Sequence, residues 1–151
     1  KEPFPLTELL LYSADRAQHI SQLLIPNLNI GNWILSDRFS GSTLAYQGYG
    51  RGLNKSIIDQ LEIIALQGIK PDLTIWLDIS VKESLRRRSK KTKDRIEAEG
   101  ELFLQKVSDG FAVIAKNNDW IRINANSHEE IISRKIQEVI INKFQTTENM
   151  S

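Results

Sequence analysis

The sequence predicts a three-layer α/β domain in which helices cover a parallel sheet. Three short runs of strand type, residues 33–37, 73–78 and 120–124, are apolar nearly throughout, as strands buried on both faces require. The segments between these runs have the periodicity of amphipathic helices. Helical crossovers of that kind join parallel strands into right-handed βαβ units.

The composition is that of one soluble globular domain, since 40% of the 151 residues are hydrophobic and 26% are charged. A net charge of +1 gives no whole-molecule attraction to nucleic acid or to an anionic membrane, so a polyanion would have to be bound by a local cluster. No apolar run approaches the roughly 20 residues that span a bilayer. The absence of cysteine and the presence of only two histidines argue against disulfides and zinc sites, and fit a reducing cytoplasm.

The first helix is predicted from Thr7 to about Asn27, with Pro26 bending or ending it. The strand at 33–37 follows. Residues 41–52 then hold four of the eight glycines and are expected to form a loop.

The next helix is bounded by Asn54, a suitable N-cap, and by Gly68, a suitable C′ residue. After the strand at 73–78, Ser80 and Glu83 have the spacing of a capping box, which predicts another helix start.

Two further helices flank the last strand at 120–124. One is predicted over about 99–117. The other begins at a second capping box, Ser127 with Glu130, and ends near Phe144.

Polar groups follow all three strands: Asp37-Arg38, Asp78 and residues 124–126. In open parallel sheets ligands bind beyond the carboxyl ends of the strands, which locates a candidate site. Asp37 and Arg38 suit a phosphate and its metal, because a guanidinium matches phosphate oxygens two at a time and a carboxylate can hold Mg²⁺. An ion pair that merely closes the strand is the alternative.

Tyr12 and Arg16 share one face of the first helix, four residues apart. A ring that stacks and a donor beside it would suit a flat heterocycle. The alternative is a core tyrosine beside an arginine that only solvates the helix.

Residues 86–93 carry six positive charges within eight positions. Such a run is usually a solvated face and less often a nucleic-acid contact. Because it follows a strand–helix unit and contains no aromatic residue, a basic lid over a triphosphate is the favoured interpretation. No Gly-Lys dipeptide occurs in the sequence, so these residues contain no Walker-type phosphate loop.

Four segments in the same order resemble the bacterial thymidylate kinases. They are residues 9–18 (LLLYSADRAQ), 36–52 (SDRFSGSTLAYQGYGRG), 71–78 (PDLTIWLD) and 94–97 (DRIE). The second segment is long and highly specific. Together the four lie between residues 9 and 97 of the 151.

The resemblance implies a role for each matching residue. Tyr12 would stack on thymine and Arg16 would hydrogen-bond the base. Arg38 would bind the dTMP phosphate, with Asp37 near the magnesium. The further contacts to the nucleotide would come from Ser42, Thr43, Tyr46 and Gln47.

In the bacterial type the lid supplies an arginine to the transferring phosphoryl group, and here Arg87 is the favoured candidate. Lys90 and Lys91 lie behind it, and Arg86 or Arg87 would also lie against adenine. Asn126 falls in a segment that resembles the loop on the far side of adenine.

The implied fold is a P-loop NTPase-like three-layer domain, the nucleoside-monophosphate kinase fold, incomplete at the N-terminus. Residues 1–144 would be the C-terminal portion of a single domain, with a lid at about 86–95 and a polar tail at 145–151. The family's opening strand, phosphate loop, helix and second strand have no counterpart in this sequence, and residues 1–3 are interpreted as a later loop.

The implied function is ATP-dependent phosphorylation of dTMP to dTDP by the complete protein, with Mg²⁺, in the cytoplasm. A homodimer is expected through helices that include residues 9–24, with no nucleic-acid or membrane partner. The chain alone is expected to be inactive. The alternatives are another nucleoside-monophosphate kinase, acting on dUMP, dCMP or dGMP, and a non-catalytic nucleotide- or nucleic-acid-binding module.

Overall fold

The computed structural model describes residues 3–88 and 100–148 and divides into two compact units. The first comprises Lys1–Lys70 with Leu102–Ile114, and the second comprises Pro71–Glu101 with Ala115–Ser151. The predicted lid residues Lys90 and Lys91, and the DRIE segment at 94–97, lie outside the described residues.

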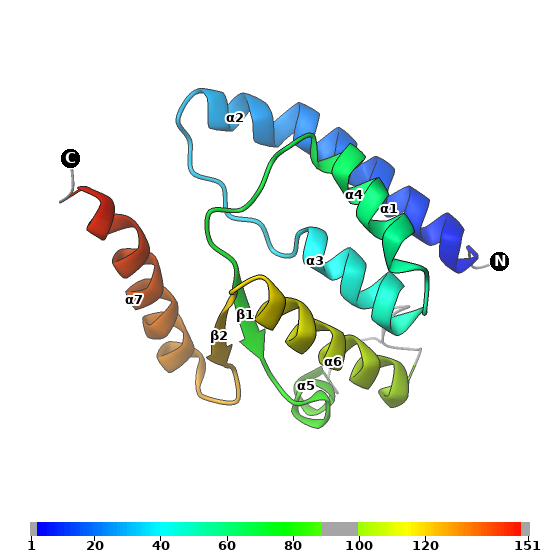
Figure 1. Ribbon diagram of the computed structural model, residues 1–151. Helices are drawn as coiled ribbons and strands as arrows, with labels where there is room; N and C mark the ends of the chain where they lie inside the picture. The colour runs from blue at the N-terminus through cyan, green and yellow to red at the C-terminus, as the bar shows by residue number, and fades with distance from the viewer. Residues whose placement is uncertain (1–2, 89–99, 149–151) are drawn as a thin grey trace. The chain divides into compact units, whose positions relative to one another are not determined.

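The first unit is helical (Figure 1). Its opening segment is one continuous run made of α1 (Pro5–His19), a π-helical turn η1 (Ile20–Leu24) and α2 (Ile25–Asn29). The predicted helix is therefore confirmed, and it continues past Pro26. Pro26 is the second residue of α2, which comes directly after the π-helical turn η1, so the run changes its hydrogen-bond pattern where the proline N–H is missing.

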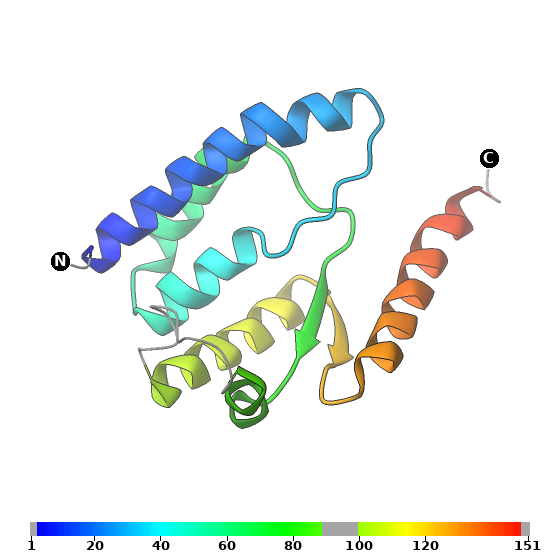
Figure 2. The same ribbon diagram turned by 180° about the vertical axis from the view of Figure 1, so that it is seen from behind.

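Helix α4 (Lys55–Leu66) runs beside α1, as Figures 1 and 2 both show. Its predicted ends are confirmed. The Asn54 side chain accepts a hydrogen bond from the Ser56 N–H at 2.8 Å, and Gly68 has a left-handed φ of 82° just past the last turn. Leu9, Ile20 and Ile58 are fully buried, so the core of this unit lies between these helices.

The loop predicted over residues 41–52 is wrong, because α3 (Ser40–Thr43) and the π-helical η2 (Leu44–Gly50) occupy most of it. Its glycines serve close packing as well as turns. A β-carbon on Gly50 would come within 2.6 Å of the Phe103 ring, which lies on α6 (Glu101–Asn117).

The strand predicted at residues 33–37 is also wrong, since these residues have no regular structure here. A strand exists only through hydrogen bonds to a neighbour. Among the described residues, the only sheet pairs β1 (Ile75–Asp78) with β2 (Ile121–Asn124).

The second unit contains that sheet, and its strands are parallel as predicted. Asp78 stands opposite Asn124 in the register, so both lie at the carboxyl edge of the sheet. Helix α5 (Val81–Arg88) follows β1 directly. Helix α7 (Glu129–Glu148) packs on β2 (Figure 2).

The two predicted capping boxes differ in outcome. Ser80 Oγ accepts a hydrogen bond from the Glu83 N–H at 3.3 Å, as expected for a cap. At α7 the helix begins at Glu129, which makes His128 the residue before it and not Ser127. That helix also continues beyond its predicted end to Glu148. None of the helices in the described ranges combines the length and the apolar character needed to cross a membrane.

Candidate active site

Arg38 lies in the short irregular segment between α2 and α3, with its backbone in the left-handed region at φ 69°. The Ser36 hydroxyl donates a hydrogen bond of 2.7 Å to the Arg38 carbonyl. Both Asp37 and Arg38 are exposed, and no ion pair joins them among the described residues. The conformation is rare for a residue with a β-carbon, and such strain is found preferentially at functional sites.

The Arg38 guanidinium lies 5.1 Å from the centre of the Tyr46 ring on η2. Tyr46 itself is buried and packs against Phe103 and Phe111, with ring centres 6.3 and 6.1 Å away. A buried aromatic ring thus supports the exposed arginine from one side.

Arg16 on α1 forms a second pair of this kind, since its guanidinium lies 5.0 Å from the Phe39 ring. Phe39 follows Arg38 directly, so the segment between α2 and α3 carries one predicted substrate arginine, Arg38, and contacts the other, Arg16. Tyr12 is 43% exposed on α1, four residues before Arg16. Sequence reasoning did not identify Phe39, although its place inside the matching motif is a usable signal.

Thr43 and Gln47 are both buried, at 4% and 3% exposure, whereas Ser42 is partly exposed. The Gln47 amide donates a hydrogen bond of 2.8 Å to Glu8 Oε1. This contact gives Gln47 a structural partner inside the first unit.

Glu8 and Arg51 form a buried ion pair that sequence reasoning missed. Arg51 Nη2 lies 3.3 Å from Glu8 Oε2, with side-chain exposures of 14% and 4%. The pair joins the start of α1 to the residue after η2. Breaking a buried pair by removing one partner leaves an uncompensated charge, so this contact holds the start of α1 and the end of η2 together.

Glu62 on α4 is a second acidic residue that was not predicted. Burial raises the pKa of its carboxyl above the ordinary value, while the Thr43 hydroxyl and the charge of Arg16 act in the opposite direction and Asp59 adds to the rise. Neither carboxylate oxygen is exposed, and neither meets hydrogen-bond geometry with a described residue. Its partners come from α1 and α3, which is why sequence spacing did not reveal it.

In the second unit, Asp78 is held by Arg122 on β2, whose Nε donates a hydrogen bond of 2.7 Å to Asp78 Oδ2. Asn124 Oδ1 accepts hydrogen bonds of 2.9 Å from both the backbone N–H and the side-chain amide of Asn126. The predicted loop at 124–126 is therefore ordered by its own side chains.

The predicted lid arginines Arg86 and Arg87 lie on α5, and both are bound by Glu83. Arg86 donates two hydrogen bonds to that carboxylate, at 2.6 and 2.7 Å, and Arg87 Nε donates one at 2.8 Å. These contacts lower the pKa of Glu83 to about 2. The two guanidinium groups are thereby gathered at one place on the helix.

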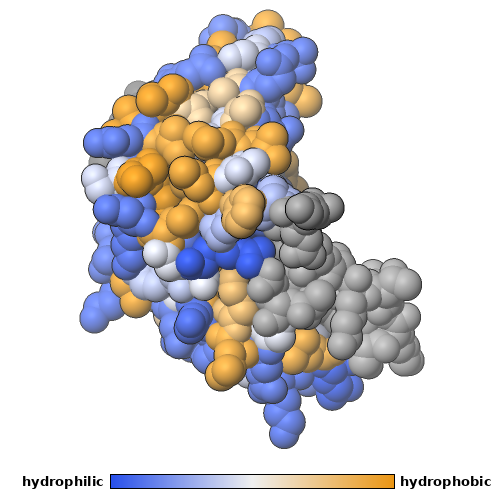
Figure 3. Space-filling view, turned by 90° about the vertical axis from the view of Figure 1, so that its right-hand side faces the viewer, coloured by the Kyte–Doolittle hydropathy of each residue, from blue (hydrophilic) through white to orange (hydrophobic). Residues whose placement is uncertain are grey.

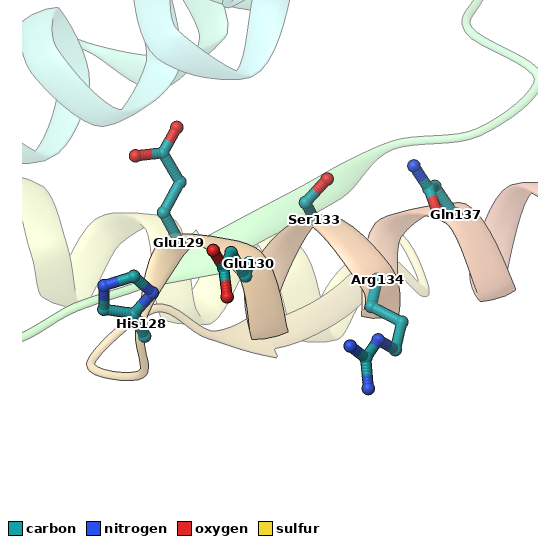
Figure 4. A pocket seen from close by; sticks show the side chains of 6 residues that line it. All are labelled: His128, Glu129, Glu130, Ser133, Arg134 and Gln137. Carbon is teal, nitrogen blue, oxygen red and sulfur yellow. The ribbon is translucent and has the colours of Figure 1, made fainter.

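A shallow surface groove runs along the start of α7 (Figure 4). Its six labelled side chains point in different directions and do not converge on one position. They are His128, Glu129, Glu130, Ser133, Arg134 and Gln137. No predicted site residue lines this groove, and no group of three acids or histidines that could hold a metal occurs in the described part of the chain.

A family model for thymidylate kinase matches residues 1–136. The chain belongs to the thymidylate kinase family. A thymidylate kinase from a strain of Prochlorococcus marinus is 58% identical over 150 residues, which are 99% of this chain and 68% of that protein. A second, from Parasynechococcus marenigrum, is 55% identical over 142 residues, or 94% of this chain and 68% of that protein.

Membership of the thymidylate kinase family confirms the predicted fold class and the predicted type of enzyme. The family consists of phosphotransferases of nucleotide biosynthesis that phosphorylate dTMP, and a kinase of this kind takes ATP as co-substrate. The non-catalytic binding module and the kinases for other nucleotides are not favoured. The chain spans about two thirds of the length of these relatives.

Proposed function

We propose that this chain carries the dTMP-binding half of a thymidylate kinase and the arginines that meet the phosphates. The observation that supports this most strongly is the pair of arginine–ring contacts in the first unit, Arg16 over Phe39 and Arg38 over Tyr46. All four residues belong to, or directly adjoin, the segments that resemble the family.

In this proposal Arg38 binds the phosphate of dTMP. Its guanidinium is exposed, rests on a ring, and presents donors in the planar fork that matches phosphate oxygens. Tyr12 stacks on thymine, Arg16 donates to its O4, and Ser42 with Thr43 lies along the nucleoside. Phosphoryl transfer then depends on positioning and charge neutralisation more than on covalent chemistry by the protein.

Asp37 would hold Mg²⁺ together with phosphate oxygens and water. An exposed carboxylate fits this role, because Mg²⁺ in such sites takes only one or two protein carboxylates. The ion would neutralise charge on the phosphates. The protein's own contribution is the acid at 37 and the adjacent guanidinium.

Arg87 is proposed as the lid arginine of the transferring phosphoryl group, with Lys90 and Lys91 behind it in the sequence. Arg86 or Arg87 is proposed to lie against adenine, with Asn126 in the loop on its far side. Glu83 supports the proposal, since it already gathers Arg86 and Arg87 on α5. The enzyme is proposed to be cytoplasmic and homodimeric, to bind neither nucleic acid nor membranes, and to need a phosphate loop that these 151 residues do not contain.

A panel of acceptors tests the proposal. The full-length protein should phosphorylate dTMP with ATP and Mg²⁺ in a coupled assay, far faster than dUMP, dCMP or dGMP. Turnover of dTMP no faster than of the other three would contradict it. The 151-residue chain assayed alone should show no turnover.

Arg38→Ala should lower kcat/KM for dTMP by about 100- to 1,000-fold, because a charged donor at the phosphate is lost. Circular dichroism and the melting temperature should stay near those of the wild type, since the side chain is exposed. Arg134→Ala, an exposed arginine on α7, is the matched control and should keep its activity. Wild-type turnover in the Arg38 variant would refute the assignment.

A further inference from the structure

Three helices of the first unit contribute side chains around the Glu62 carboxylate. Glu62 lies on α4, Arg16 on α1 and Thr43 on α3, and both Arg16 and Thr43 are close enough to influence its charge. One turn beyond Glu62, the Gln67 amide donates a hydrogen bond of 2.9 Å to Ser21 Oγ, which fixes α4 against the α1 run. The charged group therefore has a defined position between helices.

The polar atoms at this position are incompletely satisfied. Both carboxylate oxygens of Glu62 and the Nε of Arg16 are inaccessible to solvent, and none of these atoms makes a hydrogen bond of good geometry among the described residues. The Thr43 hydroxyl is close enough to lower the pKa of the carboxyl but does not reach that geometry. Buried polar atoms in folded proteins are nearly always paired, so each exception needs an explanation. The unpaired Nε of Arg16 is therefore a donor that a bound ligand could use.

The guanidinium of Arg16 is restrained on a second side. It lies 5.0 Å from the centre of the Phe39 ring, and that ring is in the segment that carries Asp37 and Arg38. Charge from Glu62 and contact with Phe39 together restrict the orientations that Arg16 can adopt. Thr43, the other neighbour of Glu62, is 4% exposed and equally confined.

Resting on the proposed function, we infer that Glu62 is a positioning residue of the nucleobase site, which holds Arg16 and Thr43 in the arrangement that recognises thymine. Glu62 acts through those two residues and has no part in phosphoryl transfer. It sets affinity for the acceptor and the choice between pyrimidines, because a restrained guanidinium favours an acceptor atom at position 4 of the base over an amino group.

Glu62→Gln in the full-length enzyme tests this inference, since it removes the charge and keeps the size. The KM for dTMP should rise about tenfold, with kcat within about twofold and the KM for ATP unchanged. The preference for dTMP over dCMP should fall by a similar factor. Glu138→Gln, the same change at an exposed glutamate on α7, is the matched control and should leave all these values unchanged.

A double-mutant cycle separates positioning from general damage. If Glu62 acts through Arg16 as well as Thr43, the rise in the KM for dTMP caused by Glu62→Gln should be clearly smaller in the Arg16→Ala background than in the wild type. Additive effects would overturn the inference, as would an unchanged KM for dTMP or an equal rise in the KM for ATP in Glu62→Gln.

Glu62→Asp keeps the charge and should keep the KM for dTMP within about threefold of the wild type. If the Gln variant fails to fold, this variant tests whether the charge at position 62 is what positions Arg16. Should the Asp variant lose affinity as strongly as Arg16→Ala, the charge at this position is not what matters and the inference fails. Failure of the wild-type enzyme to turn over dTMP is a different result, and it would refute the proposed function instead.

Discussion

Glu62 carries its carboxylate into a place where neither oxygen is accessible to water. Burial raises the pKa above the ordinary 4.5, so the folded state holds the proton more tightly than the unfolded state does. Stability contributed by this residue is therefore greatest at low pH and falls as the pH rises above about 4.5. At neutral pH the ionised carboxylate is a net cost to the fold.

Glu62→Gln should consequently be more stable than the wild type at pH 8, although it binds dTMP more weakly. The difference in the urea midpoint should shrink as the pH is lowered and should vanish below about pH 4.5, where both side chains are neutral. Unfolding curves at pH 4, 6 and 8 measure this, with Glu138→Gln on α7 as the reference. A Gln variant that is less stable than the wild type at pH 8 would contradict the expected sign.

Residues whose partners lie within a few positions could be predicted from the sequence, whereas residues whose partners lie on other helices could not. The Asn54 cap and the Ser80 cap were predicted because each bonds a backbone N–H two or three positions away. Glu8 and Glu62 were not, because their partners come from other helices. Arg51, for example, is 43 residues from Glu8.

Helix α6 packs closely against η2 at a glycine, Gly110. A β-carbon on Gly110 would come within 2.6 Å of Tyr49 Cγ, which is closer than packed atoms approach. The glycines of this contact set how tightly the two helical segments of the first unit can approach, and Tyr46 lies on the same η2 segment.

Gly110→Ala should destabilise the full-length protein by about 1–3 kcal/mol, because the added methyl group forces packed aromatic atoms to move. Alanine's better helix propensity, about 1 kcal/mol, opposes this loss and reduces what is observed. Urea unfolding measures the difference. Gly48→Ala is the graded comparison, since its nearest contacts would be 3.2 Å and its loss should be smaller. Equal stability of the Gly110 variant and the wild type would show that this contact yields easily.

The helices were predicted well because their own residues, through apolar periodicity and capping, define where a helix forms. Periodicity and caps defined α1, α4 and α6 within a few residues. The strand at 33–37 was wrong because a strand requires a partner, and none pairs with it in the described residues. The loop at 41–52 was wrong because glycine was interpreted as a turn signal where it permits close packing.

Hydrophobic side chains gather into a broad patch on the face of the molecule that Figure 3 shows. Helices α1 and α4 pack side by side, and several of their large apolar residues are about half exposed or more. They are Leu6, Leu10, Leu11, Ile63 and Ile64. Exposed apolar surface of this extent is typical of an interaction site, which supports the proposed homodimer.

Ile64→Lys should raise the dimer dissociation constant by about 100-fold, because it places a charge at each copy of a self-complementary surface. Sedimentation velocity over a range of concentrations measures the change. Ile131→Lys on α7 is the control, since Ile131 is also exposed but belongs to the second unit, and it should leave association unchanged. A wild-type protein that sediments as a monomer at all concentrations would exclude this surface as a dimer interface.

Because Arg38 has a left-handed backbone conformation, the residue that is best for stability at position 38 should differ from the residue that is best for activity. Asparagine and glycine accept that conformation more readily than arginine does. A library of all residues at position 38, sorted only by survival of heating, should enrich those two. The same library, selected by the growth of cells that depend on this enzyme to make dTDP, should return arginine. The most heat-stable variants would therefore be inactive as thymidylate kinases.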